Sequence, residues 1–354
     1  MQLSEITVGN QVLLVTTEGA RSRGTVSKIS ELLPATNIEV LDEIEPNPEI
    51  EHVDRFCSYL SGKPFDQIIA VGGGSTLDTA KALSVGLEAA RQGQSIRKYL
   101  RDSRLLSFVK PVSMIAIPTT SGTGSEVTPF ATLWDKEENE KHSLSSPVLY
   151  PGTAIIDPSL MLSLPVETTI FTGLDALSHA FESVWSRRCI PLTMSFAVRA
   201  IRLVFDALTL LEENPNSVLL REKMAEGSML SGLAIAHTRT AVCHAISYPI
   251  TSHFGMPHGL ACSFTHPSVL RFNSQVDDGR LKEVAHQLQF SSTKALAEYL
   301  EKFLSKLKIT QNLRDYIPNR SILLELTSEL FQPGRADKNM RNVSVEEMQR
   351  IISE

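Results

Sequence analysis

The sequence is poor in cysteine, in charge of one sign and in long apolar runs, and each shortage removes a class of protein. The 354 residues include four cysteines. Because they are scattered without CxxC spacing, neither a disulfide framework nor a thiolate zinc site is indicated. The formal net charge is -6, with no cluster of Lys and Arg of the kind that binds nucleic-acid phosphates. No apolar run approaches the roughly 18 residues that span a bilayer. We therefore expect a cytoplasmic protein with neither nucleic acid nor membrane as a partner.

The length and the pattern of apolar residues predict two domains. A chain of 354 residues exceeds one ordinary core, and 42% apolar residues are enough to fill two. The first part alternates helical stretches with apolar or β-branched runs, which indicates a parallel sheet with crossover helices. These runs lie at 11–17, 37–41, 67–72, 113–119 and 153–157. The charged run at 135–142 is interpreted as a solvated turn between strands.

From about Pro165 the pattern changes to long periodic segments, which predict helices. Pro158 and Pro165 bracket a short connection that is the expected boundary. The predicted organisation is an α/β nucleotide-binding domain over 1–162, with a parallel sheet, followed by an all-α metal-binding domain over 163–354.

A glycine-rich loop follows the apolar run QIIAV and precedes a helical stretch. It reads GGGS at 72–75. Glycines permit close approach of the backbone, and the exposed N–H groups at a helix start attract a phosphate. The loop fits a pyrophosphate cradle, although its spacing is not GxGxxG and such a turn is often only a turn.

A second loop, PTTSGTGSE at 118–126, follows the apolar run SMIAI and is rich in small hydroxyl side chains. In a doubly wound sheet, the carboxyl ends of neighbouring strands face one crevice, so both loops should border the same ligand. Their hydroxyl groups suit ribose, phosphate or carboxamide, or else satisfy the loop's own backbone.

The helical half contains a carboxylate and several imidazoles in a pattern that suits a metal ion. Asp175 and His179 stand four residues apart, on one face of a predicted helix. Further histidines follow at His237, His244, His253 and His258. One carboxylate with three imidazoles forms a site for iron or zinc and leaves room for a substrate oxygen.

Taken together, these motifs resemble the iron-containing (group III) alcohol dehydrogenases over nearly the whole chain. The resemblance lies in EPNP at 45–48, GGGSTLDTAK at 72–81, PTTSGTGSEVT at 118–128, DPSL at 157–160, TGLDALSHAFES at 172–183 and PHG at 257–259. It implies a nucleotide domain and a helical metal domain of the dehydroquinate synthase-like architecture. It also implies a divalent metal, Fe²⁺ before Zn²⁺, with NAD or NADP, and a homodimer.

The resemblance also assigns site residues. The metal ligands of the family match Asp175, His179, His244 and His258. Its pyrophosphate positions match Gly73, Gly74, Ser75 and Asp78. Positions along the cofactor match Thr119, Thr120 and Thr123, and a position near the ribose matches Lys141.

Two departures from the family pattern bear on chemistry. Tyr248 stands where many members carry a histidine beside the nicotinamide, so Tyr248 is either a proton relay or a packed aromatic. Thr17 stands where NAD-preferring members carry an acidic residue that pairs with ribose hydroxyls. Without that carboxylate a 2′-phosphate is not repelled, and Arg21 or Arg23 is available to meet it. NADP is therefore as acceptable as NAD.

The expected function is metal-dependent, NAD(P)-linked reduction of a small aldehyde, the metal acting as a Lewis acid on the carbonyl. The strings HAISYPITSHFG and WSRRCIPLT resemble the phosphonoacetaldehyde reductase (hydroxyethylphosphonate dehydrogenase) branch. An anionic substrate of that kind would need a cation, for which Arg187, Arg188 and Arg239 are candidates. The alternatives are a dehydroquinate synthase-like lyase, a polyol-phosphate dehydrogenase and a catalytically inactive nucleotide-binding homologue, because one fold hosts many chemistries.

Overall fold

The chain folds into two compact units. The computed structural model describes residues 3–136, 140–319, 321–330 and 336–353. The first unit runs to Thr120 and resumes over Ser125–Asp157, and the second consists of Ser121–Gly124 and the chain from Pro158 onward. This division lies between Asp157 and Pro158, whereas the sequence places the boundary after residue 162. The assignment of Ser121–Gly124 to the second unit has no counterpart in the sequence prediction.

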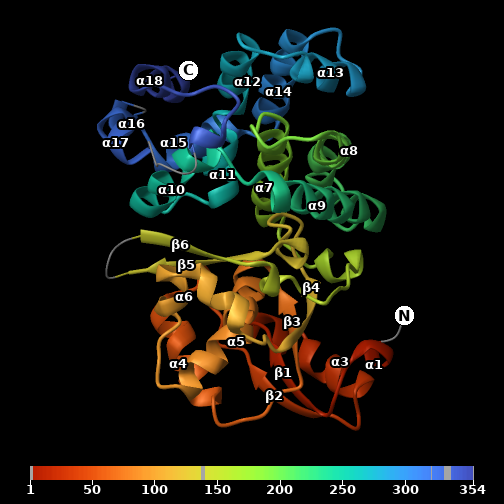
Figure 1. Ribbon diagram of the computed structural model, residues 1–354. Helices are drawn as coiled ribbons and strands as arrows, with labels where there is room; N and C mark the ends of the chain where they lie inside the picture. Colours follow the sequence, from red (N-terminus) through yellow and green to blue (C-terminus); the bar gives the residue numbers. More distant parts are fainter. Residues whose placement is uncertain (1–2, 137–139, 320, 331–335, 354) are drawn as a thin grey trace. The chain divides into compact units, whose positions relative to one another are not determined.

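The first unit is built on a parallel sheet, as predicted (Figure 1). Five strands follow the order β2-β1-β3-β4-β7, and every neighbouring pair is parallel. The strands are β1 (Gln11–Val15), β2 (Asn37–Leu41), β3 (Gln67–Gly72), β4 (Ser113–Pro118) and β7 (Thr153–Ala154). The helices are α1 (Leu3–Ile6), α2 (Glu18–Ser22), α3 (Thr25–Leu32), α4 (Ile50–Leu60), α5 (Gly74–Arg91) and α6 (Arg97–Arg101). Short 3₁₀ turns lie at Ser103–Phe108, Ser125–Val127 and Pro147–Leu149.

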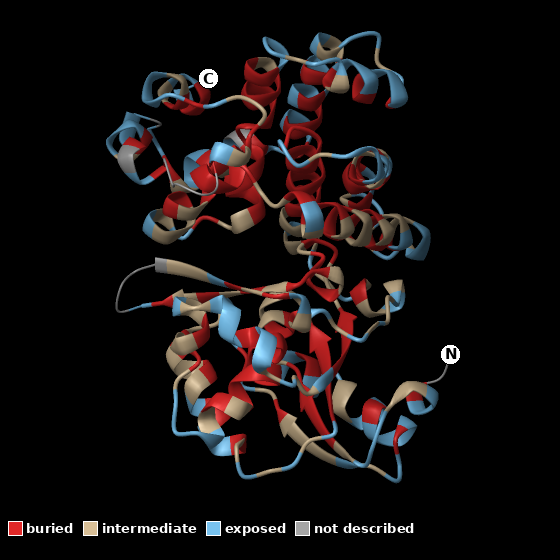
Figure 2. Cartoon of the chain, in the orientation of Figure 1, coloured by how far each residue is buried: buried red, intermediate tan, exposed pale blue. Residues whose placement is uncertain are grey.

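Burial on both faces explains why the central strands β1, β3 and β4 are largely apolar. All six residues of β3 are buried, as expected for a parallel strand covered on two sides. One face of the sheet, including Leu13, Ile68 and Met114, packs with α4 and α5 in a single apolar core. Figure 2 shows the central strands as mostly buried. The sheet therefore holds the ends of β3 and β4, and the loops that follow them, in fixed positions.

A two-stranded antiparallel hairpin was not predicted. It consists of β5 (Phe130–Asp135) and β6 (Glu140–Ser145). Buried and half-buried residues alternate along β5, and Ala131, Leu133 and Leu144 join the same core as α5. The charged run predicted as a turn therefore includes the end of β5 and the start of β6, and its residues 137–139 lie outside the described part of the chain.

The second unit is helical, as predicted. Its first helices are α7 (Val166–Val184), α8 (Pro191–Leu211), α9 (Val218–Thr238), α10 (Val242–Phe254), α11 (His258–Ser263) and α12 (His266–Ser274). The later ones are α13 (Arg280–Gln287), α14 (Thr293–Lys306), α15 (Ile309–Tyr316), α16 (Ser321–Glu325), α17 (Thr327–Leu330) and α18 (Val345–Ser353). Two 3₁₀ turns lie at Pro158–Met161 and Ala336–Lys338. Helix α7 packs against α8, α9 and α11 and is buried along most of its length (Figure 2).

The segment Ser121–Gly124 joins this helical unit through close backbone contacts. A Cβ atom on Gly122 would lie 2.8 Å from the Thr172 Cβ, and one on Gly124 would lie 2.5 Å from the Gly232 Cα. Gly124 also has φ +60, a conformation that glycine adopts without strain. The glycines of the threonine-rich loop are therefore required where this segment meets α7 and α9.

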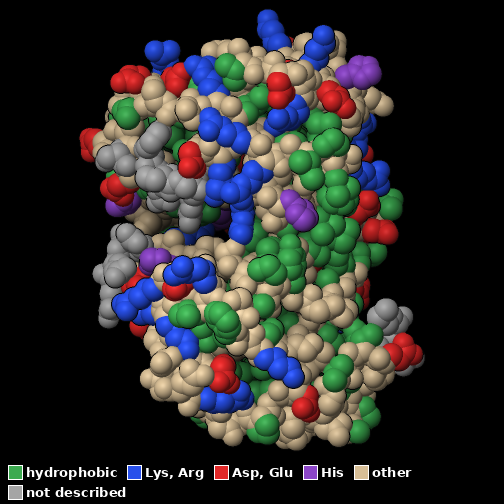
Figure 3. Space-filling model, in the orientation of Figure 1, with side chains coloured by type: hydrophobic (Ala, Val, Ile, Leu, Met, Phe, Trp, Pro, Cys, Tyr) green, Lys and Arg blue, Asp and Glu red, His purple; other side chains and the backbone are tan. Residues whose placement is uncertain are grey.

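The surface agrees with the composition. No helix in the described residues is long and apolar enough to cross a membrane. On the face drawn in Figure 3, Lys and Arg side chains gather in places, with Asp and Glu side chains around them.

Candidate metal centre and nucleotide-binding loops

Helix α7 presents the first two metal-site residues on one buried face. Asp175 is 5% exposed and His179 is 6% exposed. Their i,i+4 spacing places the His179 Nε2 atom 3.6 Å from the Asp175 Oδ1 atom, as expected for side chains one turn apart. A buried carboxylate beside an imidazole is costly unless it has a partner, so this pair indicates a site rather than packing alone.

Two further imidazoles converge on the same carboxylate oxygen. The Nε2 atom of His244, near the start of α10, lies 3.6 Å from Asp175 Oδ1. The Nε2 atom of His258, at the start of α11, lies 3.9 Å from it. The rings of His179 and His244 stack with their centroids 4.8 Å apart. Ligand atoms of Asp175, His244 and His258, with that of Cys262, lie within 4.8 Å of one another. The fourth predicted ligand, His179, adjoins this group through Asp175 and His244.

The donor atoms of this cluster fit a divalent cation. Asp175 Oδ1 and His244 Nε2 are buried and have no hydrogen-bond partner, a rare state for buried polar atoms. Burial opposes ionisation of Asp175, but the nearby His179, His258 and His244 rings outweigh it and lower the carboxyl pKa. The charged carboxylate and the imidazole nitrogens form a set of hard and intermediate donors that suits iron or zinc. The His258 side chain is 30% exposed, so the cluster is open on that side.

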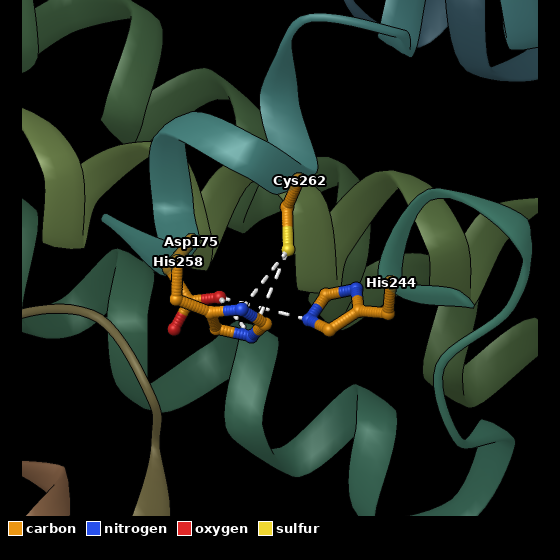
Figure 4. A group of neighbouring side chains, drawn as sticks. All are labelled: Asp175, His244, His258 and Cys262. Carbon is orange, nitrogen blue, oxygen red and sulfur yellow. Dashed lines mark hydrogen bonds and ion pairs between the residues drawn. The ribbon is translucent and has the colours of Figure 1, made fainter. Parts of the chain in front are cut away.

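Cys262 also borders the cluster, which the sequence analysis did not anticipate. Its Sγ atom lies 3.7 Å from His258 Nε2, and its thiol points toward Asp175, His244 and His258 (Figure 4). Burial raises the pKa of the thiol, which favours the neutral form. The only signal in the sequence was its position one helical turn after His258.

Glu182, further along α7, is a second residue that the sequence analysis did not single out. It is fully buried and its Oε2 atom lies 2.6 Å from His244 Nδ1. Burial opposes ionisation of Glu182. The His244 ring and the backbone N–H groups of Ala241 and His244, at the start of α10, outweigh burial and lower the pKa of the carboxyl. Glu182 is the second-last residue of the motif TGLDALSHAFES at 172–183. Its contact with His244 depends on how the later chain folds back onto α7, and the spacing of residues in the sequence does not reveal this.

Tyr248 lies beside the metal-site imidazoles. Its ring stacks on that of His258 with centroids 5.5 Å apart and an interplanar angle of 14°. It meets the His244 ring edge-on at 6.3 Å. The phenol therefore stands at the more exposed side of the cluster.

The glycine-rich loop forms the start of α5. Gly73 is the N-cap residue, and no side chain caps the helix there. The first N–H groups of a helix lack intrahelical partners and attract anions. A Cβ atom at Gly73 would lie 3.3 Å from the Thr120 side chain, so the loops after β3 and β4 meet, as the sequence predicts. Within this loop, the Ser75 hydroxyl accepts a hydrogen bond from the Asn47 N–H at 3.2 Å.

Three other residues that were predicted at the cofactor contact other residues of this chain. The Asp78 carboxylate accepts hydrogen bonds from the Ser125 hydroxyl at 2.6 Å and the Thr132 N–H at 2.8 Å. The Thr17 hydroxyl caps α2 by accepting from the Ala20 N–H. Lys141, on β6, lies over the Trp134 ring at 5.5 Å.

The three threonines that were predicted along the cofactor are half-buried. Thr119 and Thr120 are half-buried at the end of β4, and Thr123 is half-buried within the segment that joins the helical unit.

The three arginine candidates differ in their surroundings. Arg187 and Arg188 are exposed, and Arg187 donates a hydrogen bond to Asn342 at 2.6 Å. Arg239 is half-buried and has φ +65 between α9 and α10. A positive φ is uncommon for a residue with a side chain and often accompanies a functional constraint.

Comparisons with known proteins agree with this geometry. The model of the iron-containing alcohol dehydrogenases matches residues 2–158. The C-terminal model of the Fe-containing alcohol dehydrogenase family matches residues 169–354. The two matches correspond to the two halves of the chain.

Three relatives illustrate the range of the similarity. Aldehyde-alcohol dehydrogenase 2 of Entamoeba histolytica is 31% identical over 309 residues, which is 84% of this chain and 35% of that protein. The NAD-dependent methanol dehydrogenase of Bacillus methanolicus is 29% identical over 97% of this chain and 91% of its own length. The crystal structure of sulfoacetaldehyde reductase from Bifidobacterium kashiwanohense in complex with NAD+ has a TM-score of 0.90 and 28% identity, covering 99% of this chain and 92% of that one.

The chain thus spans about a third of the length of the first relative. It spans nearly the whole of the other two. The family models, the parallel α/β unit and the helical unit with its buried Asp and His cluster agree, and the chain belongs to the iron-containing alcohol dehydrogenase family.

Proposed function

We propose that this protein reduces a small aldehyde to the alcohol, with NADH or NADPH as reductant and a divalent metal held by Asp175, His179, His244 and His258. The observation that carries the proposal is the convergence of three imidazole Nε2 atoms within 4 Å of one buried carboxylate oxygen, at 3.6, 3.6 and 3.9 Å. When bound, the metal supplies positive charge that polarises a substrate carbonyl, and the reduced nicotinamide supplies the hydride.

The residues of the chain prepare the site for this chemistry. Asp175 supplies negative charge, and the imidazoles supply lone pairs, at a site where Asp175, His179 and His244 are buried. Low exposure excludes water and strengthens electrostatic interactions. The more exposed edge of His258 leaves one side for a substrate. Iron is the metal that family membership favours, and zinc suits the same donors.

The nucleotide is assigned to the loops after β3 and β4. The uncapped start of α5 suits the pyrophosphate, with Gly73, Gly74, Ser75 and the threonines of the second loop around it. Lys141 is assigned to the ribose. NAD+ is bound by the similar sulfoacetaldehyde reductase, and Thr17, which carries no charge, leaves NADP acceptable in this chain.

The proposed substrate class is a short aldehyde with a tetrahedral anionic group, and phosphonoacetaldehyde is the specific candidate. The similar sulfoacetaldehyde reductase acts, by its name, on an aldehyde that carries a sulfonate. Arg239 is the candidate cation, because it is half-buried and has an uncommon backbone conformation just before α10. Arginine pairs well with phosphonate or sulfonate oxygens.

The test is a reconstitution with the metal-stripped chain. The protein is mixed with NADH or NADPH and with phosphonoacetaldehyde, sulfoacetaldehyde or butanal, and ferrous iron or zinc is then added without oxygen. We expect metal-dependent loss of reduced-cofactor absorbance, fastest with phosphonoacetaldehyde. Equal kcat/KM for phosphonoacetaldehyde and butanal would refute the substrate, and no turnover with any metal would refute the reaction.

Tyr248 is proposed as the group that delivers the proton to the product oxygen, through its own phenol. Its stacking on His258 at 5.5 Å keeps it beside the open edge of the metal cluster. Tyr248→Phe should lower kcat about 100-fold, the usual scale of a general acid, while metal content stays at the wild-type value. A kcat within twofold of wild type would assign Tyr248 to packing.

The proposed assembly is a cytoplasmic homodimer, because symmetric dimers are the commonest assemblies of enzymes. Light scattering of the purified chain measures this directly, and a monomeric mass would contradict it.

A further inference from the structure

Glu182 makes an unusual number of contacts with the segment that carries His244. One oxygen, Oε1, accepts hydrogen bonds from the backbone N–H groups of Cys243 at 2.6 Å and His244 at 3.2 Å. The other, Oε2, accepts from the Ala241 N–H at 2.9 Å and lies 2.6 Å from the Nδ1 atom of the His244 ring. The side chain is fully buried, so water does not compete for these bonds.

Part of this arrangement is a helix cap. Ala241 is the N-cap residue of α10 and its side chain cannot accept a hydrogen bond. The first N–H groups of a helix need acceptors, and negative charge is favourable there. The carboxylate of Glu182, supplied by α7, satisfies three of these groups and so attaches the start of α10 to α7.

The fourth contact reaches the ring and has a chemical consequence. Because three N–H groups already point at the carboxylate, its oxygens act as acceptors, and the His244 Nδ1 atom must be the donor. A neutral imidazole that is protonated at Nδ1 has its lone pair at Nε2. That Nε2 atom faces Asp175 Oδ1 at 3.6 Å and has no hydrogen-bond partner.

We propose that Glu182 is a positioning residue that holds His244 in the Nδ1-protonated tautomer and thereby sets the affinity of the centre for its metal. Carboxylates that accept from the second nitrogen of a metal-binding imidazole orient the ring and raise its basicity. The inference rests on the metal centre proposed above and is independent of the choice of aldehyde or cofactor.

Glu182→Gln separates orientation from capping, because glutamine has nearly the same shape. If its amide oxygen faces Cys243 and His244, its NH₂ group occupies the place of Oε2 and donates to His244 Nδ1. The proton of the ring must then move to Nε2, where it blocks metal binding. The first orientation sets a donor against one N–H group, that of Ala241. The reversed amide would keep the ring contact but set a donor against two N–H groups, those of Cys243 and His244, so it is the less favourable of the two. If Glu182 only capped α10, the variant would be less stable in either orientation but the tautomer of His244 would not change. A changed tautomer is expected only if Glu182 also orients the ring.

The first measurement reads the tautomer directly. Metal-free protein with ¹⁵N-labelled histidine is studied by long-range ¹H–¹⁵N correlation at a pH high enough for the His244 ring to be neutral, and the His244 signals are identified by their absence in His244→Gln. We expect the proton on Nδ1 in wild type and on Nε2 in Glu182→Gln. A wild-type His244 that is protonated at Nε2 would overturn the proposal, even if the variant did not fold.

The second measurement is the dissociation constant for Zn²⁺, obtained by competition with a chelator of known affinity. We expect binding to weaken about 10- to 100-fold in Glu182→Gln, the usual range for such partners. Glu126→Gln is the matched control, because Glu126 is also buried, at 4% exposure, but lies in the other unit; its affinity for Zn²⁺ should equal that of wild type.

The outcomes distinguish the two proposals. A wild-type chain that binds no Zn²⁺ overturns the metal centre, and with it the effect on affinity. Wild-type binding with an unchanged dissociation constant in Glu182→Gln overturns only the role of Glu182.

Discussion

At the scale of single residues, His179 and Cys262 both offer an atom beside Asp175, His244 and His258. His179 Nε2 is as close to Asp175 Oδ1 as the Nε2 of His244, at 3.6 Å. The Cys262 thiol is buried among the same donor atoms, but the ligand set proposed above contains His179 and not Cys262. We therefore expect His179→Asn to weaken Fe²⁺ or Zn²⁺ binding at least about 100-fold. Loss of a residue that only supports a ligand weakens binding about 10- to 100-fold, and loss of a direct ligand should weaken it more.

Cys262→Ser is the matched control for this prediction. Serine keeps the size of the side chain and removes the thiol. We expect one bound metal per chain and a nearly unchanged dissociation constant, measured by metal analysis after dialysis. Loss of metal in Cys262→Ser with retention in His179→Asn would exchange the two assignments.

His266 should make the fold sensitive to acid. Its ring is fully buried near Phe181 and Trp185, and neither ring nitrogen has a hydrogen-bond partner. Burial lowers the pKa of His266 from 6.5 to about 3. Glu182 opposes this shift and His244 adds to it, both by less than burial does. In the unfolded chain the same imidazole takes up a proton near pH 6.5.

Between pH 6.5 and about 3 the unfolded state therefore binds more protons, and the free energy of unfolding falls as the pH falls. From pH 7 to pH 5 this residue should remove about 2 kcal/mol, given 1.36 kcal/mol per pKa unit. Urea titrations of His266→Gln should lack this part of the loss. The same change at the exposed His286 should leave the wild-type slope, and identical slopes for all three proteins would contradict the prediction.

These residue-scale results show what sequence spacing can and cannot reveal. Asp175 and His179 were predictable together because helical periodicity alone places them on one face. The approach of His244 and His258 was expected from the family pattern. The contact of Glu182 with His244 Nδ1 was not predictable, because it depends on how α10 starts against α7 after the chain has passed through α8 and α9.

At the scale of helices, Gly259 permits the close approach of α11 to α7. A Cβ atom there would lie 1.8 Å from the Phe171 carbonyl oxygen and 3.0 Å from the Asp175 N atom. Because both are backbone atoms of α7, Gly259→Ala must push α11 away and move His258 from Asp175. We expect a loss of stability of about 1–3 kcal/mol from overpacking, with weaker metal binding measured by chelator competition.

Gly227→Ala is the control for the added methyl group. A Cβ at Gly227 would meet its nearest atoms at 3.4 Å, which is ordinary contact. Alanine favours a helix over glycine by about 1 kcal/mol, so this variant should be as stable as wild type or more so. A Gly259→Ala protein with wild-type metal affinity would mean that α11 does not set the position of His258.

The strands differ in how far they could be predicted. The central strands β1, β3 and β4 were predictable because burial on both faces makes each largely an apolar run, as in QIIAV. In β5 the residues Phe130, Thr132 and Trp134 are half-buried between buried neighbours. The resulting mixed sequence FATLWD gives no clear strand signal, and only the charged run at 135–142 was interpreted, as a turn between strands.

At the scale of the whole molecule, the four proposed ligands all belong to the second unit. A metal that binds only the native state stabilises it by about 4 kcal/mol at a thousandfold excess over its dissociation constant. Removing the metal should therefore increase amide hydrogen exchange in α7, α10 and α11. The amides of β1, β3 and β4, in the first unit, should exchange at unchanged rates.

Hydrogen exchange with mass-spectrometric detection, before and after chelation, measures this difference. Readdition of Zn²⁺ should restore protection, and His258→Ala should exchange like the metal-free protein with or without Zn²⁺. Equal changes in the sheet and in the helices would contradict a metal centre confined to the second unit.

The assignment of Ser121–Gly124 to the helical unit has a consequence for the order of events during translation. These residues leave the ribosome directly after β4, but their packing partners, Thr172 on α7 and Gly232 on α9, are synthesised later. The loop after β4 therefore cannot reach its final conformation until α9 has emerged. A piece of the second unit is therefore synthesised in the middle of the first, and it waits for helices that are made later.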